Sequence, residues 1–393
     1  MKRVAVLGAG PAGSMAAARL AASGLHTTLI DEKPPWEKPC GGGVTFKAYN
    51  QYPFLLHNDT AKRVVHHTWL HAPKVGGVRM DLNQPLVIYS RKDLNAMLLD
   101  RAEKAGVEIA IERVAAIDRT SRGWDIRTKA GTIETDYVVV ATGARNSLKQ
   151  FGTSYTAADT MYALGYYVPT DRHQIDIQFL ENLEGYIWVF PRCGHLSVGI
   201  CGKGEPAQAL RARLEAYMER NDLPLKDATF YGHMLPSLER AGWQNNRVSG
   251  DRWVAVGDAA GLVDPITGEG IYYAMRSGDL AGELIGSDLE DPAQHADSYR
   301  NLIAREFTDD LAYGSTIAKR VFLGNFLFGS NPSRMVQFLR RSPGFTAIMQ
   351  EVFAGTITYF DLRRRLLSNI NCSVTEIAMN ILLGRRPSPS VGI

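Results

Sequence analysis

The chain has 393 residues and a formal net charge of +3, with 45% hydrophobic and 22% charged residues. This is the composition of an ordinary globular protein, and the length suggests two or three domains. No run of about 18 uncharged apolar residues is present, which argues against a membrane-spanning helix. The four cysteines form no CxxC pair and have no histidine spacing suited to zinc, so we expect no metal site, no structural disulfide and a cytoplasmic location.

The first 33 residues predict a strand, a glycine loop, a helix and a second strand in direct succession. Val4 to Leu7 is a short apolar run typical of a buried parallel strand, and the sequence GAGPAG follows at Gly8–Gly13. A helix rich in alanine breaks at Gly24, and a second strand covers residues 27–30. Asp31 then stands 23 residues after Gly8. A chain that begins with a core strand leaves no room for a cleaved signal peptide.

Each part of this opening segment has a role in binding a dinucleotide. The first glycine permits a tight turn, the second admits a pyrophosphate, and the third lets the helix pack close to the strand. The N–H groups at the start of the helix attract phosphates. Asp31 can accept hydrogen bonds from ribose hydroxyls. A glycine-rich turn that binds no nucleotide is the alternative interpretation.

The segment from residue 80 to residue 150 keeps an α/β pattern. We expect a helix that starts at 90–93, a strand over 107–111 and a hairpin within 123–135. A further buried strand is expected over 136–141, where Thr142-Gly143 follows.

Residues 155–235 show a different pattern. Apolar and polar residues alternate over 174–180, 186–190 and 196–201, which predicts an antiparallel sheet with a helix at 207–220. The apolar run 252–256 then restores a buried strand, which Gly257-Asp258 follows.

The nucleotide-binding pieces are therefore separated by an inserted sheet, an arrangement that suits a flavoprotein with a long FAD. No second GxGxxG follows a strand, so a dedicated nicotinamide domain is not expected. The electron donor would be NAD(P)H in transient contact or a ferredoxin-type partner.

The C-terminal quarter is predicted to be helical, apolar and basic. Residues 295–393 contain 12 Lys and Arg against 7 Asp and Glu, whereas residues 1–294 contain 32 against 34. Such a region can rest on an anionic membrane surface, and helices with solvated arginines that pack on the protein body are the alternative. Basic clusters interleaved with stacking aromatics are absent, so we expect no nucleic-acid partner.

Several motifs resemble those of a known family. The stretch 252–278 resembles the second FAD motif of the monooxygenase-type flavoproteins. Within that class the chain is similar to the geranylgeranyl reductase family, through KPCGGG at 38–43, YIWVFP at 186–191 with Val198-Gly199, and the ending GTITY at 355–359 with an arginine run.

The resemblance implies an α/β fold with a Rossmann-like (GR2-type) FAD-binding domain. That domain would combine residues 1–150 with 250–290. The inserted antiparallel-sheet substrate domain would comprise 50–90 and 151–249, and residues 291–393 would form a C-terminal helical region.

The resemblance also implies the cofactor site. Asp258 would bind the ribityl chain, the turn at 265–270 would direct N–H groups to the flavin N1 and O2 edge, and Arg91 would lie near a phosphate or ribose. An ordinary loop-to-helix junction and a surface arginine are the alternatives for the last two. The expected cofactor-binding set is Gly8, Gly10, Pro11, Ala12, Gly13, Asp31, Glu32, Lys33, Cys40, Gly41, Gly42, Arg91, Val114, Thr142, Gly143, Gly257, Asp258, Pro265, Gly268, Glu269, Gly270 and Ile271.

Cys40 is the expected catalytic residue, because the resemblance implies a cysteine close to the flavin that assists proton delivery or gates the site. A small buried residue in a glycine loop is the alternative. The expected substrate-binding residues are Tyr186, Trp188, Phe190 and Pro191, whose strand lines an apolar tunnel in the family. A stripe of sheet-core aromatics is the alternative here. Cys201 stands where many members have a further glycine.

The leading hypothesis is an FAD-dependent reductase that passes hydride from reduced flavin to a C=C bond of a polyprenyl substrate. The polyprenyl group would be carried on a lipid, a diphosphate or a quinone-like head, and a prenyl lipid is the expected partner. An O2-dependent monooxygenase or a flavin-dependent halogenase is the second hypothesis. A halogenase needs a lysine beside the oxidant, and the sequence assigns none of Lys47, Lys62 or Lys74 to that place. An FAD-bearing assembly protein without turnover is the third. Peripheral membrane contact would accompany a lipid substrate.

Overall fold

The protein is described from a computed structural model, which covers residues 2–148, 150–287 and 292–368. The chain divides into two compact units, each assembled from three segments. The first unit comprises Met1–Lys38, Arg91–Thr160 and Met234–Ala312. The second comprises Pro39–Ser90, Met161–His233 and Tyr313–Ile393. One of the four cysteines, Cys372, and the Arg385-Arg386 pair of the basic C-terminal quarter lie outside the described residues.

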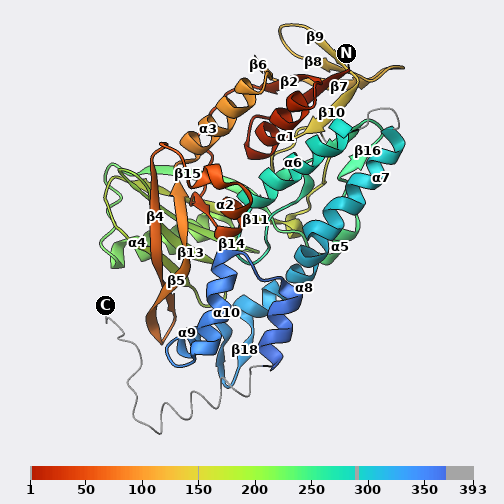
Figure 1. Cartoon of the computed structure of the whole chain (residues 1–393). Helices are drawn as coiled ribbons and strands as arrows, with labels where there is room; N and C mark the ends of the chain where they lie inside the picture. The colour runs from red at the N-terminus through yellow and green to blue at the C-terminus, as the bar shows by residue number, and fades with distance from the viewer. Residues whose placement is uncertain (1, 149, 288–291, 369–393) are drawn as a thin grey trace. The chain divides into compact units, whose positions relative to one another are not determined.

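The first unit is built on a six-stranded sheet whose central strands are all parallel (Figure 1). Its order is β16 (Ser249–Gly250), β17 (Trp253–Ala255), β10 (Tyr137–Val140), β1 (Arg3–Leu7), β2 (His26–Asp31) and β6 (Glu108–Ile111). The side chains of β1 from Val4 to Leu7 are fully buried, as expected for a strand covered on both faces.

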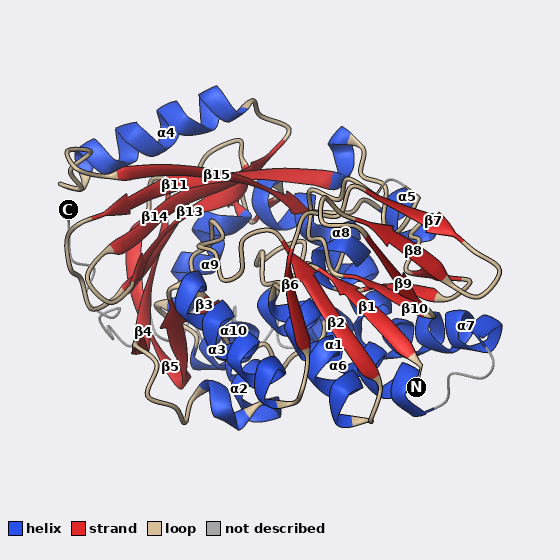
Figure 2. Ribbon diagram, turned by 90° about the horizontal axis from the view of Figure 1, so that it is seen from above, coloured by secondary structure: helices blue, strands red, loops and turns tan. Residues whose placement is uncertain are grey.

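Helices cover one face of this sheet and a small second sheet covers the other (Figure 2). The helices are α1 (Pro11–Ala22), α3 (Arg91–Lys104) and α6 (Ile271–Ser287). The second sheet consists of β7 (Ala116–Arg119), β8 (Trp124–Arg127) and β9 (Thr132–Thr135), which pair antiparallel. Close packing of α1 on α6 depends on Gly278, because a Cβ there would lie 2.1 Å from the carbonyl oxygen of Ala12.

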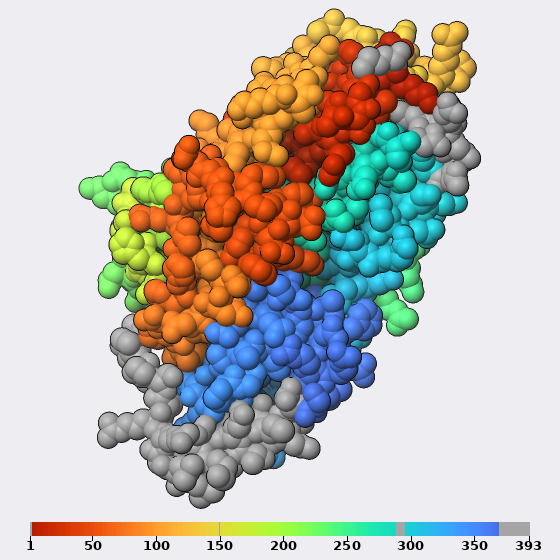
Figure 3. Space-filling model, viewed as in Figure 1, coloured from red at the N-terminus to blue at the C-terminus, as the bar shows by residue number. Residues whose placement is uncertain are grey.

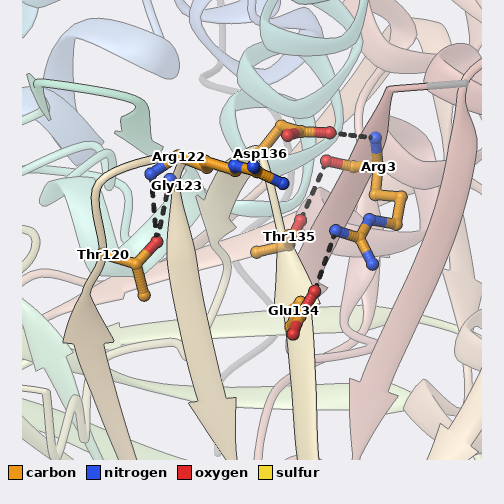
Figure 4. A network of polar contacts seen from close by, with 7 residues as sticks. All are labelled: Arg3, Thr120, Arg122, Gly123, Glu134, Thr135 and Asp136. Atoms are coloured by element: carbon orange, nitrogen blue, oxygen red, sulfur yellow. Dashed lines mark hydrogen bonds and ion pairs between the residues drawn. The ribbon is translucent and has the colours of Figure 1, made fainter.

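A network of polar contacts ties the start of β1 to the end of β9 and to Asp136, which follows it (Figure 4). The Arg3 N–H donates to Asp136 Oδ2 at 2.7 Å, and its guanidinium donates to Glu134 Oε2 at 3.2 Å. Thr135 Oγ1 donates to the Arg3 carbonyl at 2.9 Å. Thr120 Oγ1 accepts from the N–H groups of Arg122 and Gly123 and so closes the β7–β8 turn.

The first unit extends further along the chain than the expected boundary at residue 290. Helix α7 (Pro292–Ile303) contacts β16, β17 and α6, and the buried Tyr299 hydroxyl donates to the Ala255 carbonyl at 2.9 Å. A π-helical turn (Ala304–Thr308) leads into α8 (Asp309–Leu323). The short helix α5 (Arg240–Gln244) also belongs to this unit.

The second unit is built on an eight-stranded sheet. Its order is β15 (Thr229–Pro236), β11 (Thr160–Val168), β14 (Leu196–Lys203), β13 (Glu184–Pro191), β12 (Ile175–Phe179), β4 (Lys62–Ala72), β5 (Gly76–Tyr89) and β3 (Gly43–Val44). The pairings of β12 with β13 and of β13 with β14 are antiparallel as expected, whereas β12 and β4 pair parallel. The long hairpin of β4 and β5 was not predicted from the sequence.

The two faces of β13 have different partners. Ile187 and Val189 point into a core shared with α4 (Ala207–Arg220), where Leu210 and Leu214 are fully buried. Tyr186, Trp188 and Phe190 alternate with them and therefore lie on the opposite face. We call this opposite face the aromatic face.

The C-terminal helices of the second unit pack on its β4–β5 hairpin. Helix α9 (Asn331–Leu339) contacts β4 and β5, and α10 (Pro343–Ala354) contacts β5. Residues 359–368 are helical. A small hairpin of β18 (Asn325–Phe326) and β19 (Gly329–Ser330) separates α8 from α9, and α2 (Phe46–Gln51) follows the glycine loop near β3.

No helix among the described residues combines the length and the apolar character needed to cross a bilayer. Over the same residues there is no group of three or more metal-ligating side chains, and Cys40, Cys193 and Cys201 are free thiols. Burial raises the pKa of the Cys201 thiol to about 12, so this thiol stays protonated at neutral pH.

Candidate functional site

The glycine loop of the first unit has the geometry of a dinucleotide-binding turn. Gly8 has φ +109°, and a Cβ there would lie 2.4 Å from the Ala141 carbonyl oxygen. A Cβ at Gly13 would lie 1.8 Å from the Gly8 carbonyl oxygen, whereas Gly10 faces open space. Pro11 stands in the first turn of α1, and no side chain caps the helix at Gly10. The first N–H groups of α1 are therefore available to an anionic ligand.

Asp31 fixes the loop to the end of β2. Its Oδ2 accepts from the Ala9 N–H at 2.7 Å, and its Oδ1 accepts from the Lys33 N–H at 3.0 Å. Each carboxylate oxygen can accept a further bond, so a ribose contact is compatible with these two. Glu32 and Lys33 have exposed side chains.

Arg91 is only 4% exposed at the start of α3. Glu37 caps this helix, because its carboxylate accepts from the N–H groups of Arg91 at 3.0 Å and Lys92 at 2.9 Å. The Arg91 guanidinium reaches Asn95 Oδ1 at 3.4 Å, but its Nε is buried and has no acceptor among the described residues. The sequence had not identified Glu37.

The hydroxyl of Thr142 is a second buried polar group without a partner in the described part of the chain. Thr142 follows β10, and the adjacent Gly143 has φ +76° with open space at its Cβ position. Val114 packs against the hydrophobic core of the first unit.

Asp258 forms a largely buried ion pair that the sequence did not predict. Lys38 Nζ donates to Asp258 Oδ2 at 2.5 Å, and the two side chains are 17% and 8% exposed. The Tyr155 hydroxyl donates to the Asp258 carbonyl. Burial raises the pKa of Tyr155 well above its usual value, and the nearby Asp258 charge adds to this, so the phenol stays protonated. Gly257 has φ +59°, and a Cβ there would lie 3.0 Å from the Cβ of Ala12.

The turn from Pro265 to Gly270 is closed internally. Asp264 Oδ1 accepts from the N–H groups of Ile266 and Thr267, and Glu269 Oε1 accepts from the Tyr272 N–H at the start of α6. The Gly268 N–H donates to the Asp264 carbonyl. Within the described residues, the N–H groups of Gly270 and Ile271 are left without an acceptor.

These features of the first unit fit FAD. The uncapped helix start and the free N–H groups of Gly270 and Ile271 are donors for phosphate and flavin oxygens. The buried polar atoms of Arg91 and Thr142 need partners that the described residues do not supply, and a polar cofactor would provide them. Most of the residues predicted to bind the cofactor lie in this unit, whereas Cys40, Gly41 and Gly42 of the same predicted set lie in the second unit.

In the second unit, the loop that carries Cys40 packs on the aromatic face of the sheet. A Cβ at Gly41 would lie 2.7 Å from the ring of Phe190, and one at Gly43 would lie 3.0 Å from it. Gly42 has φ +86°, and its Cβ would lie 2.0 Å from the Tyr89 carbonyl oxygen. The Gly42 N–H donates to the Cys40 thiol sulfur at 3.3 Å. The triple glycine thus brings the backbone against Phe190, with the half-buried thiol beside it.

A buried arginine and a serine hold the Cys40 backbone. Arg192 is fully buried, its guanidinium donates to the carbonyls of Cys40 at 2.5 Å and Gly41 at 3.4 Å, and it lies over the Tyr167 ring at 5.0 Å. Ser197 Oγ donates to the Cys40 carbonyl at 3.0 Å. Because that bond uses the only proton of Ser197, the Tyr231 hydroxyl at 2.9 Å must be a donor to Ser197.

Sequence analysis missed Arg192, Ser197 and Tyr231. Burial raises the pKa of Tyr231 above its usual value, so this phenol also remains neutral. The available signal was weak. It consisted of an arginine placed directly after the buried Pro191 at the end of a strand.

Strand register explains the aromatic face. Phe190 lies opposite Ser197, Trp188 opposite Gly199, and Tyr186 opposite Cys201. A Cβ at Gly199 would lie 2.2 Å from the Trp188 ring, so glycine there makes room for the indole. The indole N–H donates to Ser197 Oγ at 3.3 Å.

The far end of the aromatic face is covered by α8. The ring of Phe322 stacks on Tyr186 with centroids 6.5 Å apart and lies 6.3 Å from Phe179. Cys201, the departure noted in the sequence, is buried at this end of the face. The second unit thus unites Cys40, Gly41, Gly42 and the aromatic residues of β13.

Comparison with known proteins supports this interpretation of the fold. A model of the pyridine nucleotide-disulphide oxidoreductase family matches residues 2–148, and a model of the FAD dependent oxidoreductase family matches residues 84–278. The chloroplastic geranylgeranyl diphosphate reductase of Nicotiana tabacum is 29% identical over 368 residues, covering 84% of this chain and 76% of that protein. The digeranylgeranylglycerophospholipid reductase of Methanocaldococcus jannaschii is 27% identical over 306 residues, covering 73% of this chain and 77% of that protein.

A solved structure shows the same fold. The crystal structure of a geranylgeranyl bacteriochlorophyll reductase-like protein from Thermoplasma acidophilum matches with a TM-score of 0.77 at 22% identity. The match covers 96% of this chain and 99% of that one. At this identity the likeness is one of architecture.

Proposed function

Since the chain belongs to the geranylgeranyl reductase-like FAD-dependent oxidoreductases, we propose that it reduces C=C bonds in the polyprenyl chain of a lipid. The observation that carries the proposal is the Cys40 loop, which Arg192 and Ser197 hold against the aromatic face of β13. A thiol beside an apolar, aromatic surface suits delivery of a proton to a substrate that offers few hydrogen bonds of its own.

The first unit would hold the cofactor. The glycine loop and α1 would bind the pyrophosphate, Asp31 the adenosine ribose, Arg91 a phosphate or ribose, and Asp258 with Lys38 the ribityl chain. Gly270 and Ile271 would donate N–H groups to the flavin ring edge. When bound, FAD supplies hydride-transfer chemistry.

The second unit would bind the substrate. Tyr186, Trp188 and Phe190 present flat apolar rings to a prenyl chain, with Pro191 at the end of the strand. Cys40 would supply the proton that accompanies reduction, and the carbonyl bonds from Arg192 and Ser197 would fix the backbone that carries the thiol. A prenyl lipid resides in a bilayer, so we also propose peripheral membrane contact.

Reduction of one C=C bond takes up two electrons and two protons. Those electrons would come from NAD(P)H or from a ferredoxin-type protein. Anaerobic reduction of the flavin with NADPH alone would identify the first source, and a requirement for reduced ferredoxin would identify the second.

An oxygen-dependent reaction is the alternative, and the contacts of Lys62 and Lys74 argue against its halogenase form. Lys62 Nζ donates to backbone and side-chain oxygens of Asn58, and Lys74 is 83% exposed and pairs with Glu181. Lys38 pairs with Asp258. Chloride-dependent product, or O2 consumption coupled to substrate, would favour the alternative.

The decisive experiment is anaerobic. The FAD-loaded protein is reduced with dithionite, and a geranylgeranyl diphosphate or geranylgeranyl lipid is added. We expect the flavin to reoxidise and the product to gain two mass units per turnover. A flavin that stays reduced until air is admitted would contradict the reductase proposal.

The role of Cys40 is tested with Cys40→Ser, and Cys193→Ser at the exposed thiol serves as the control. We expect Cys40→Ser to bind FAD normally and to reoxidise reduced flavin at least about tenfold more slowly, since general acids contribute factors of this order or larger. Full turnover in Cys40→Ser with bound FAD would rule out the proton-donor role.

A further inference from the structure

The small hairpin between α8 and α9 has an unusual turn. Asn325 pairs with Ser330 and Phe326 with Gly329, so the loop consists of Leu327 and Phe328 alone. Both have positive φ, +47° for Leu327 and +60° for Phe328. A two-residue turn with two positive φ values normally carries Asn-Gly or Asp-Gly, because large side chains are strained in this region.

These two strained residues are also exposed. Phe328 is 106% exposed and Leu327 is 48% exposed, and Leu323 at the end of α8 is 38% exposed. The positive φ angles and the exposure of two apolar side chains to water both disfavour the folded state. Residues that persist at such a cost point to a function.

The turn is nevertheless firmly built. Arg334 Nε donates to the Phe326 carbonyl at 3.1 Å, and its guanidinium also donates to the Leu327 carbonyl. The Asn331 N–H donates to the Gly324 carbonyl at 2.9 Å and closes the base of the hairpin. The apolar tip is therefore presented on a fixed support.

The chain segment that carries the tip is basic. Residues 313–368 contain eight Lys and Arg against Glu351 and Asp361 alone, a net charge of +6. Lys319 and Arg320 have exposed side chains in the last turn of α8, next to the hairpin in the chain. In the space-filling view, the C-terminal part of the described chain forms one continuous surface (blue in Figure 3).

We propose that the β18–β19 hairpin is a membrane wedge, in which Leu327 and Phe328 insert into a bilayer rich in anionic lipid. Lys319 and Arg320 would attract the lipid phosphates, and the side chains of Leu327 and Phe328 would enter the acyl region. An anionic bilayer matches both features, because its phosphates attract the positive charge and its acyl region accepts the exposed apolar tip. This inference deepens the proposed membrane contact, but it needs no catalytic turnover.

The turn offers a sharp test, because the residues that suit its backbone are known. The double variant Leu327→Asn/Phe328→Gly should relieve the turn strain and raise the thermal midpoint or leave it unchanged. The same variant should bind vesicles of phosphatidylcholine with phosphatidylglycerol at least about tenfold more weakly than the wild type, because two apolar side chains no longer insert. Binding is measured by cosedimentation of the full-length protein, without substrate.

The matched control is Leu225→Asn, which removes another exposed leucine of the same unit and should not change vesicle binding. Wild-type binding should require the anionic lipid and weaken as salt is raised. In a second measurement, the Phe328→Trp variant should show a blue-shifted difference emission on anionic vesicles, and Leu225→Trp should not.

Three outcomes would overturn the proposal. They are unchanged vesicle binding in the double variant, a large fall in its thermal midpoint, and a wild-type protein that binds no vesicles. In the last case, a concentration-dependent dimer that the double variant abolishes would assign the tip to a second copy of the chain. None of these results depends on reductase turnover, so the two proposals can fail separately.

Discussion

At the scale of single residues, the buried Arg192 holds the loop that carries Cys40 in place. Arg192 is fully buried and donates to two carbonyls of the glycine loop. Loss of its guanidinium would leave the Gly41 carbonyl without this donor, which costs about 1–3 kcal/mol for a buried group. The Cys40 carbonyl would keep only its bond from Ser197. Arg192 is therefore a positioning residue for the thiol under the proposed function.

We expect Arg192→Met to lower kcat by about ten- to a hundredfold, because a shift of the order of 1 Å in a reacting group has effects of that size. KM should change little, since the aromatic residues remain. The Cys40 thiol should also react faster with a thiol reagent, measured in a Cys193→Ser background. Arg192→Lys should restore part of the rate. Arg211→Met is the control, because that arginine also lies over aromatic rings but is half exposed. Equal losses in both methionine variants would contradict the positioning role.

A second prediction concerns the Lys38–Asp258 ion pair of the first unit and its effect on stability and FAD binding. Removal of one member of a buried ion pair leaves an uncompensated charge and costs up to about 3–5 kcal/mol; the 17% exposure of Lys38 places the expected value nearer 2 kcal/mol. Lys38→Met should therefore lower the thermal midpoint of the FAD-free protein clearly. Asp258→Asn should weaken FAD binding by about tenfold or more in a fluorescence titration, since it removes a charged acceptor.

The control for Lys38→Met is Lys104→Met, whose partner Asp100 is four residues away on the exposed surface of α3. That pair is worth only about 0.3–0.5 kcal/mol. The double variant Lys38→Met/Asp258→Asn should lose less stability than the two single effects predict together, because it removes both charges. Additive losses would show that the two side chains act independently.

At the scale of elements, the contact between α1 and α6 positions the glycine loop. A Cβ at Gly278 would lie 2.1 Å from the carbonyl oxygen of Ala12, which is backbone and cannot rotate away. Gly278→Ala should force the helices apart, cost about 1–3 kcal/mol and weaken FAD binding, because the proposed function assigns the N–H groups of Ala12 and Gly13 to the cofactor phosphates. Glu283→Ala, on the exposed side of α6, is the control and should leave both the thermal midpoint and FAD affinity nearly unchanged. Normal FAD affinity in Gly278→Ala would show that the loop does not depend on this helix contact.

Elements with a strong local pattern were predictable from the sequence. The strands β13 and β14 and the helix α4 are where the sequence indicated them, because each has a clear local pattern of apolar residues. The hairpin of β4 and β5 was missed. Pro85 lies inside β5, and β4 carries three histidines and has a register irregularity between Val65 and His67.

The residues of the candidate site also fall into those that a local sequence pattern identifies and those that it does not. The glycine loop, Asp31 and Asp258 have short local signatures, so the sequence could identify them. Arg192 and Cys40 are 152 residues apart, and Lys38 and Asp258 are 220 apart. Such pairs form only when segments that are distant in the sequence pack together in the folded protein. A local sequence pattern does not indicate which distant segments meet.

At the scale of the whole chain, two segments, Pro39–Ser90 and Met161–His233, interrupt the first unit. For each of them, the points where the chain leaves and re-enters the first unit lie close together. Glu37 accepts from the N–H groups of Arg91 and Lys92, so the chain leaves at Lys38 and returns at Arg91 beside it. The Asp159 carbonyl accepts from the Ser237 N–H at 2.8 Å, and its carboxylate accepts from the Glu239 N–H at 3.0 Å. The exit near Thr160 and the return near Met234 are therefore also held together within this unit.

This arrangement predicts that the FAD-binding function can be isolated. A protein that joins residues 1–38, 91–160 and 234–312 by two short Gly-Ser linkers should fold and bind FAD, because every residue assigned here to the first-unit site is retained. Its thermal midpoint should rise with FAD concentration, by the equivalent of about 2.7 kcal/mol when FAD is at a hundred times its Kd. The contiguous fragment 1–160 is the control. It lacks β17 and α6, so the buried side of β10 and the packed face of α1 would be exposed, and it should neither fold nor bind FAD. If the joined protein folds cooperatively but binds no FAD while the full chain does, residues of the second unit must complete the cofactor site, and the division of roles between the units would have to be abandoned.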